Sequence, residues 1–321
     1  MKYSRVIVTG SLSYDYIMSM PSKFKDHIMP DKIHTLNVSF IMKKFRKEFG
    51  GTAGNITYSL TLLKIPTLLV GTVGNDFGPY KLHLKKHKLV DVSGIKVYKN
   101  ISSARGFVMT DSDDNQIWGF FEGAMAKSSN LKIHTFFKDG DFLVIAPNDP
   151  EAMVNYAVEA KKYNIPYLFD PAFNIPHIPT LKLLKTIEAS EILIGNDYEI
   201  ELILRRLGAT INDLTNLVKC IVITYGSKGS KILTKGKIIS VKPAKPKNIS
   251  DPTGAGDCYR AGFLAGYIKR LPIKVCAQMG SVASVYTVEK YGTQTHKFTL
   301  REFSKRFKDN FKSTLTGLTA E

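Results

Sequence analysis

The sequence predicts a doubly wound α/β protein whose mostly parallel sheet is flanked by helices. Short apolar runs recur along the chain, bounded by Gly, Pro, Asn or Asp and without polar alternation. Such runs are typical of strands that are buried on both faces. Helical patterns lie between them, and strands that alternate with helices form parallel sheets. The length of 321 residues suits one domain with a small appendage.

The predicted elements follow one another in regular order. The expected buried strands are at residues 6–8, 68–70, 142–145, 167–169, 192–194 and 221–223, and the clearest helices between them are at 55–63, 150–163 and 197–207. Near the C-terminus Phe303, Phe307 and Phe311 recur at every fourth position. That spacing predicts a helix that packs its aromatic side against the core.

Two segments depart from this order. Residues 35–42 alternate apolar and mostly polar side chains, which predicts a half-buried antiparallel strand. Residues 105–121 contain two extended runs around a polar turn at 111–115, which predicts a hairpin. We expect two insertions, at about 16–46 and 98–122, to form a small β-sheet lid on the single domain of residues 1–321.

The composition argues against several classes of protein. No apolar run approaches the ~18 residues that a membrane span needs, and the run Val6–Val8 is too short for a secretory signal. We therefore expect a cytoplasmic protein with no membrane partner. The three cysteines, Cys220, Cys258 and Cys276, are far apart, so we expect neither a disulfide framework nor a zinc site.

The formal net charge of +17 raises the question of nucleic-acid binding. The basic residues are spread along the chain and interleaved with apolar residues at helical spacing, as at 297–312. This distribution is typical of solvated helix faces. We do not expect a dedicated nucleic-acid partner. If one exists, its binding would collapse with modest added salt.

The strongest chemical signal is the run Gly254–Asp257, where a loop with Pro252 leads into a helix rich in small residues. A helix N-terminus exposes unpaired N–H groups and favours anions such as phosphate. Asp257 lies in the first helical turn and could accept a proton from an attacking hydroxyl. The alternative is a glycine turn in which Asp257 only complements the helix dipole. Neither a Walker A loop nor a dinucleotide-binding glycine pattern is found.

Four motifs together resemble the ribokinase-like (PfkB) family of carbohydrate and nucleoside kinases over essentially the whole chain. Along the chain they are Gly50–Asn55, Asn196–Glu199, Thr224–Gly229 and Gly254–Asp257, which is the order expected for that family. Within the family the sequence is most similar to bacterial adenosine kinases, on the segments 10–15, 34–40, 121–125 and 147–153. The resemblance implies a ribokinase-like fold and the use of ATP with Mg²⁺.

The resemblance also implies roles for individual residues. Asp257 would act as the base, with the backbone of Gly254, Ala255 and Gly256 around the transferred phosphoryl group. Ribose would be held by Ser11, Asp15, Gly51 and Asn55, although Asn55 also fits a helix N-cap. Adenine would meet Phe107, Met125 and Asn174. Phe173 is an alternative to Asn174, and packing within the lid is an alternative for Phe107 and Met125.

Further residues are implied on the nucleotide side. Glu199 would hold Mg²⁺ through water, beside Asn196, although both also fit a helix cap. ATP would meet Thr224, Gly226, Ser281 and Ser284, although helix packing explains the two serines equally well, and Gly229 is expected to be a turn glycine. A monovalent cation, K⁺ in this family, would lie at Asp251 and Thr253. Lys290 could add a carbonyl there or replace the cation with its own charge.

The function implied is transfer of the γ-phosphate of ATP to the 5′-hydroxyl of adenosine. The alternatives are another kinase of the family, namely a broad nucleoside kinase, a ribokinase or another sugar kinase. A non-enzyme alternative is a relative that senses nucleosides or binds nucleic acid. The exposed edge of a lid sheet is compatible with a homodimer formed through the lids.

Overall fold

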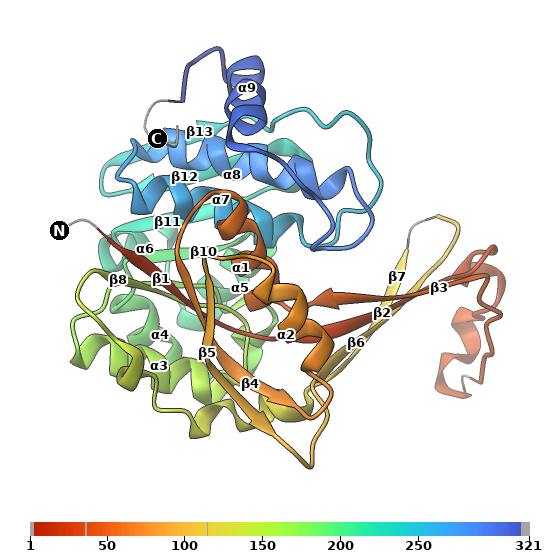
Figure 1. The fold of residues 1–321 in the computed structure, drawn as a ribbon. Coiled ribbons are helices and arrows are strands. Elements are labelled where there is room, and N and C mark those ends of the chain that lie inside the picture. The colour runs from red at the N-terminus through yellow and green to blue at the C-terminus, as the bar shows by residue number, and fades with distance from the viewer. Residues whose placement is uncertain (1–2, 36, 114, 316–321) are drawn as a thin grey trace.

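The computed structural model describes residues 3–35, 37–113 and 115–315. Its main body is a nine-stranded sheet with the order β13-β12-β11-β10-β9-β8-β1-β4-β5 (Figure 1). All neighbours from β11 to β5 are parallel, and β12 and β13 add an antiparallel edge. The strands are β1 (Arg5–Thr9), β4 (Thr67–Gly74), β5 (Val90–Tyr98), β8 (Asp141–Ile145), β9 (Tyr167–Phe169), β10 (Ile192–Asn196), β11 (Cys220–Thr224), β12 (Ser230–Thr234) and β13 (Lys237–Val241).

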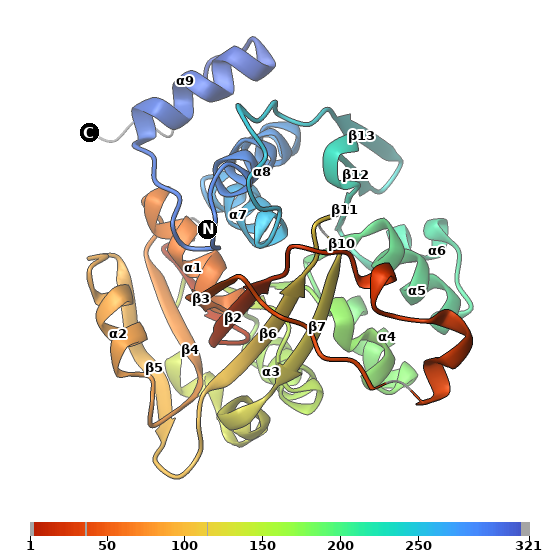
Figure 2. The same cartoon turned by 90° about the vertical axis from the view of Figure 1, so that its right-hand side faces the viewer.

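Helices cover both faces of this sheet (Figure 2). The buried strand residues alternate between two apolar clusters: Val6 and Val8 belong to the cluster with α1, α7 and α8, whereas Ile7 belongs to the cluster with α3, α4 and α5. The helices are α1 (Thr52–Leu62), α2 (Gly78–Lys85), α3 (Pro150–Lys162), α4 (Thr180–Glu188), α5 (Asp197–Leu207), α6 (Ile211–Leu217), α7 (Ala255–Ile268), α8 (Ile273–Val288) and α9 (Leu300–Phe311), with short 3₁₀ segments η1 (Phe24–Asp26), η2 (Pro30–Thr35), η3 (Gly123–Asn130), η4 (Ile133–Phe136), η5 (Ala172–His177) and η6 (Gly226–Lys228).

The predicted fold class is confirmed. Each of the six expected buried runs lies in a strand of the large sheet, and the expected helices lie in α1, α3 and α5. The aromatic seam near the C-terminus is confirmed too, since Phe303 and Phe307 of α9 are buried and Phe311 packs against the same cluster.

A second sheet of four strands projects from the main body (Figure 1). Its order is β3-β2-β6-β7, with β2 and β6 parallel and the outer pairs antiparallel. The predicted hairpin is confirmed, with Asp114 of its turn outside the described residues. The strands are β2 (Ser13–Ser19), β3 (Lys44–Gly50), β6 (Ala104–Thr110) and β7 (Gln116–Phe121).

The strand predicted at residues 35–42 is wrong. The strand that pairs with β2 is β3, which begins only at Lys44, and residues 37–42 are irregular. The alternation there has another cause: Phe40 packs edge-on against Phe24, at 5.4 Å between ring centroids, while Ile41 is exposed. Leu36 lies outside the described residues.

The register of the small sheet assigns its side chains to two faces, because successive residues of a strand point to opposite sides. Asp15 is paired with Gly106 of β6. The Asp15 face carries Asp15, Ile17, Gly106, Val108, Trp118 and Phe120. The Phe107 face carries Tyr16, Met18, Phe45, Phe107, Met109, Ile117 and Phe121.

The large sheet has one topological switch point. From β1 the chain moves to β4 and β5 on one side, and it later returns to β8 and β9 on the other side. In sheets of this kind ligands bind beyond the carboxyl ends of the strands near such a point. Within the described residues, no helix is long and apolar enough to cross a membrane.

Candidate active site

The turn at Gly254 leads directly into α7. Gly254 is left-handed, with φ of 77°, and is the residue before the first helical one. A Cβ there would lie 2.8 Å from Cγ2 of Thr293, so the close approach of the 293 loop favours glycine as well. Gly256 is exposed and Asp257 is partly exposed, so the turn lies at the surface and not inside the core.

Three N–H groups of this turn have no protein acceptor among the described residues. They belong to Gly254, Gly256 and Asp257, whereas the Ala255 N–H donates to the Pro252 carbonyl at 3.1 Å. The predicted contribution of the Ala255 amide to phosphoryl binding therefore does not fit this geometry. The remaining donors lie at the positive end of a 14-residue helix and can bind an anion.

Asp257 lies beside these donors and contacts the first turn of α1. Its Oδ2 accepts a hydrogen bond from Nδ2 of Asn55 at 2.8 Å. Burial raises the pKa of Asp257 to about 6, against lowering effects of Arg260 and of the Asn55 hydrogen bond. The carboxylate is therefore ionised at neutral pH, and its basicity is higher than that of an exposed aspartate.

Behind the turn lies a buried ion pair that the sequence analysis missed. Nη2 of Arg260, one turn along α7, donates to Oδ1 of Asp170 at 2.7 Å, and both side chains are buried. A Cβ on Gly256 would lie 2.9 Å from Nη1 of Arg260, so the guanidinium is close under the amides. The only sequence signals were an arginine within an apolar helix and an Asp-Pro pair after β9.

Asp15 occupies a space that neighbouring glycines leave open. A Cβ on Gly50 would overlap its carboxylate, and one on Gly106 would lie 2.9 Å from its Oδ1. Ser13 donates to Oδ1 at 2.9 Å. Asp15 is 7% exposed, and burial raises its pKa to about 6, with Glu48 on β3 adding to the shift.

Ser11 and Gly51, predicted to contact ribose, have clear structural roles. The Ser11 Oγ accepts the Thr52 N–H at 3.0 Å and so caps α1. Gly51 has φ of 85°, and a Cβ there would be 2.7 Å from the Ser13 backbone nitrogen. Both residues bring the loop after β1 close to the start of α1, within which Asn55 faces Asp257.

Phe107 lies on the opposite face of the small sheet from Asp15. Its ring stacks on Tyr16 at 5.2 Å between centroids. A base held beside Asp15 would therefore lie on the other face from Phe107, and the predicted stacking of Phe107 on adenine does not fit that arrangement. Trp118 and Phe120 share the Asp15 face instead, and both are partly exposed.

Phe173 of η5, the residue named as an alternative, lies near Phe120, with 6.2 Å between ring centroids. Asn174 is buried, and its Nδ2 donates to the Asn148 carbonyl at 2.7 Å. Met125 is 2% exposed and lies in η3. Neither side chain is presented at the surface as the base-binding prediction requires.

The Asn196–Glu199 motif forms a helix cap. Asn196 Oδ1 accepts the Glu199 N–H and Glu199 Oε2 accepts the Asn196 N–H, both at 2.7 Å. The capping alternative is thus confirmed. Burial, followed by Asp170, raises the pKa of Glu199, and Arg260 opposes the shift. Glu199 therefore belongs to the electrostatic surroundings of the buried ion pair, and its role toward Mg²⁺ stays a prediction.

The remaining nucleotide-side residues lie at the ends of β11 and along α8. Thr224 ends β11, and Gly226 follows with φ of 55° in a turn open to solvent. Ser281 Oγ accepts the Ala244 N–H at 2.7 Å, and Ser284 Oγ donates to the Ala255 carbonyl at 3.0 Å. Ser284 thus packs α8 against the first turn of α7.

Asp251 connects two loops beside the turn. Its Oδ1 accepts the Thr253 N–H at 2.9 Å and its Oδ2 accepts the Gly292 N–H at 3.3 Å. Within the described residues, no three His, Cys, Asp or Glu side chains gather as metal ligands. A monovalent cation at Asp251 and Thr253 would need backbone carbonyls, and it stays a prediction.

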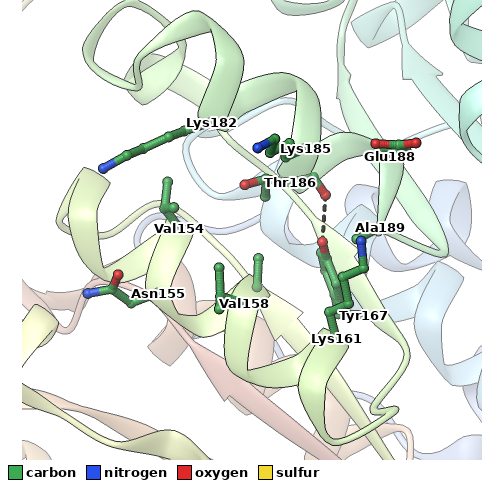
Figure 3. A pocket seen from close by; sticks show the side chains of 11 residues that line it. Val154, Asn155, Val158, Lys161, Tyr167, Lys182, Lys185, Thr186, Glu188 and Ala189 are labelled. Atoms are coloured by element: carbon green, nitrogen blue, oxygen red, sulfur yellow. Dashed lines mark hydrogen bonds between the residues drawn. The ribbon is translucent and has the colours of Figure 1, made fainter.

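A separate hollow of about 500 Å³ lies between α3 and α4 (Figure 3). Lys161, Lys182 and Lys185 surround it, and Tyr167 lines it while donating to the Thr186 carbonyl. Tyr167 begins β9, whereas Asp170 follows the same strand. The hollow is therefore at the other end of the strands and does not belong to the site.

Comparison with known proteins agrees with this geometry. The model of the pfkB family of carbohydrate kinases matches residues 10–299. The nucleoside kinase of Methanocaldococcus jannaschii is 32% identical over 92% of this chain and 94% of its own. The structure of a Burkholderia thailandensis nucleoside kinase with inosine has a TM-score of 0.89 at 29% identity, covering 97% of this chain and 99% of its own. The same kinase with ADP and inosine has a TM-score of 0.87 at 30% identity, covering 98% and 100%.

The family match over residues 10–299 contains the whole small sheet and every turn of the candidate site. The chain belongs to the pfkB family of carbohydrate kinases, and it is a phosphotransferase of the ribokinase-like fold with an alcohol group as acceptor.

Proposed function

We propose that this kinase transfers the γ-phosphoryl group of ATP to the 5′-hydroxyl of a nucleoside. The observation that carries the proposal is the turn at α7, where backbone N–H groups that donate to none of the described residues lie next to the Asp257 carboxylate. A relative solved with inosine and with ADP supports a nucleoside and ATP as the two substrates. Adenosine is the acceptor that the sequence favours.

Asp257 accepts the proton of the 5′-hydroxyl as the phosphoryl group is transferred. The amides of Gly256 and Asp257 and the guanidinium of Arg260 stabilise the negative charge on the phosphoryl oxygens. Such transfer needs positioning and charge stabilisation more than covalent participation. Mg²⁺, held through water near Glu199, would supply further charge neutralisation, and K⁺ near Asp251 stays a proposal of the same kind.

The Asp15 face is the proposed nucleoside side of the site. A carboxylate can accept from two neighbouring hydroxyls, which suits the 2′,3′-diol of ribose. Trp118, Phe120 and Phe173 would stack on the base. Stacking tolerates every base because each has a π face. We therefore propose that several nucleosides, adenosine included, are substrates, with the small sheet closing over them as a lid.

A coupled assay of ADP release tests this function. The acceptors are adenosine, inosine, guanosine, cytidine and ribose, each with ATP and Mg²⁺. We expect turnover with more than one nucleoside and much weaker turnover with ribose. Fastest turnover with ribose would favour a sugar kinase instead. Nucleoside binding without any ADP release would favour the nucleoside-sensing alternative.

We also propose that two copies pair through the Phe107 face. Phe45, Phe107, Ile117 and Phe121 expose 40–64% of their surface there. A group of exposed apolar side chains of this kind usually marks an interface, and a second copy supplies a matching one. In light scattering, Phe45→Ser should turn a dimer into a monomer, while Ile238→Ser on the exposed edge β13 should not. A monomeric wild type at high concentration would rule the dimer out.

A further inference from the structure

Gln294 lies at the centre of a buried hydrogen-bonded chain that ends at Asp257. Its Nε2 donates to Asn55 Oδ1 at 2.9 Å and to the Tyr80 hydroxyl at 2.5 Å. Tyr80 in turn donates to the Gly50 carbonyl at 2.8 Å, and Asn55 Nδ2 donates to Asp257 Oδ2. Gln294, Tyr80 and Asn55 are 6%, 0% and 5% exposed, so water does not compete for these bonds.

The directions of the bonds in this chain follow from the hydrogen bond that Tyr80 donates. The Tyr80 hydrogen is used by the Gly50 carbonyl, so the hydroxyl must accept from Gln294. The second hydrogen of Gln294 Nε2 then goes to Asn55 Oδ1. Because Asn55 Oδ1 accepts the hydrogen bond from Gln294, the NH₂ group of Asn55 is the one that faces Asp257. A free asparagine amide could flip and present its oxygen to the carboxylate.

The backbone is shaped around this contact. A Cβ on Gly54 would overlap the Tyr80 hydroxyl and lie 3.0 Å from Gln294 Nε2. Because Gly54 has no side chain, the Tyr80 hydroxyl and Gln294 can lie close enough to α1 to bond with Asn55. Gln294 also contacts the ring of His83, whose pKa is lowered mainly by burial and raised in part by Gln294.

We propose that Gln294 is a positioning residue of the phosphoryl-transfer reaction: through Asn55 it orients the Asp257 carboxylate, and Tyr80 holds Gln294 in place. This inference rests on the proposed function, because it assigns Asp257 as the base. It predicts that loss of Gln294 slows the chemical step and leaves substrate binding nearly unchanged, since no bond of Gln294 is directed at a substrate group.

The inference also predicts a change in pH dependence. The Asn55 hydrogen bond lowers the pKa of Asp257, so its loss must raise that pKa. The other charged groups that act on Asp257 are Arg260 and Asp170 behind the turn and Asp15 on β2. None of them is bonded to Gln294, so replacing Gln294 leaves them in place.

The test compares Gln294→Leu and Tyr80→Phe with Tyr58→Phe, all measured in single turnover so that chemistry limits the rate. Tyr58 is the matched control: it lies on α1, and its buried hydroxyl also donates to a carbonyl, that of His296, but it has no bond to Asn55 or Gln294. We expect Gln294→Leu to lower the rate roughly tenfold or more and to move the acidic limb of the profile to higher pH. Tyr80→Phe should do the same to a smaller extent, and Tyr58→Phe should not move the limb.

A double variant separates this inference from the proposed function. In an Asp257→Asn background, adding Gln294→Leu should cause no further loss, because Gln294 acts through Asp257. Near-normal turnover of Asp257→Asn alone would overturn the proposed base and with it this inference. An inactive Asp257→Asn together with wild-type rates and an unmoved limb in Gln294→Leu and Tyr80→Phe would overturn the inference alone. If Gln294→Leu does not fold, the single-turnover rate and the acidic limb of Tyr80→Phe test the inference in its place.

Discussion

Asp257 and Asp15 are two carboxylates with the same raised pKa, about 6, in very different surroundings. Asp257 is held by Asn55 and lies near the Arg260 guanidinium. Among the described residues, Asp15 accepts a hydrogen bond from Ser13 alone, and glycines on the two neighbouring strands leave space beside its carboxylate. The first environment suits the proposed base, and the second leaves acceptor capacity for the hydroxyl groups of the proposed ribose.

The largest expected effect follows from removing Asp257. Asp257→Ala should lower kcat by at least about 10²-fold, because general-base help is typically worth that much or more. The melting temperature should not fall, because a carboxylate whose pKa is raised by folding destabilises the folded state when it is ionised, and the substitution removes it. ADP release and thermal unfolding check the two parts. A folded variant with near-normal turnover would exclude Asp257 from the mechanism.

Asp15 should behave differently, through binding and stability. Asp15→Asn should raise KM for the nucleoside by about tenfold or more, because hydrogen bonds to a charged group are lost. Since the folded pKa lies above the unfolded one, the ionised carboxylate destabilises the fold above about pH 6. The variant should therefore be more stable than wild type at neutral pH, by roughly 3 kcal/mol at most.

That gain should disappear as the pH falls below about 4, where Asp15 is protonated in both states. Urea unfolding at neutral and at acidic pH measures the difference. Asp31→Asn, at an exposed position, is the control and should change little at either pH. An equal gain at both pH values would show that charge burial is not its cause.

The two faces of the small sheet give a third contrast. Trp118→Ala should raise KM for nucleosides by about tenfold, since base stacking is worth ~1–3 kcal/mol. Phe107→Ala, on the other face, should leave that KM nearly unchanged in the same steady-state assay. The reverse result would mean that the base binds against the Phe107 face, as the sequence analysis expected.

The sequence was sufficient for the large sheet and for the turn at Gly254, and it failed where the answer depends on strand register. Buried parallel strands and a glycine turn before a helix can be recognised from neighbouring residues alone, without knowledge of the tertiary contacts. The face occupied by Phe107 depends on its pairing with Tyr16, and a shift of one residue reverses it. The Arg260–Asp170 pair and the contact of Gln294 with Asn55 join residues 90 and 239 positions apart, which no local pattern reports.

The smallest expected effect tests the open space around Asp15 directly. A Cβ at position 106 would lie 2.9 Å from Asp15 Oδ1, so Gly106→Ala must push the carboxylate aside or narrow the space for a ligand. We expect KM for the nucleoside to rise by about three- to tenfold with kcat little changed, the sign of weakened ground-state binding. Gly119→Ala on the adjacent strand is the matched control, because a Cβ there meets no atom within 4 Å. If both alanines have the same KM as wild type, the glycines around Asp15 serve the packing of the sheet, and the proposed ribose site must lie elsewhere.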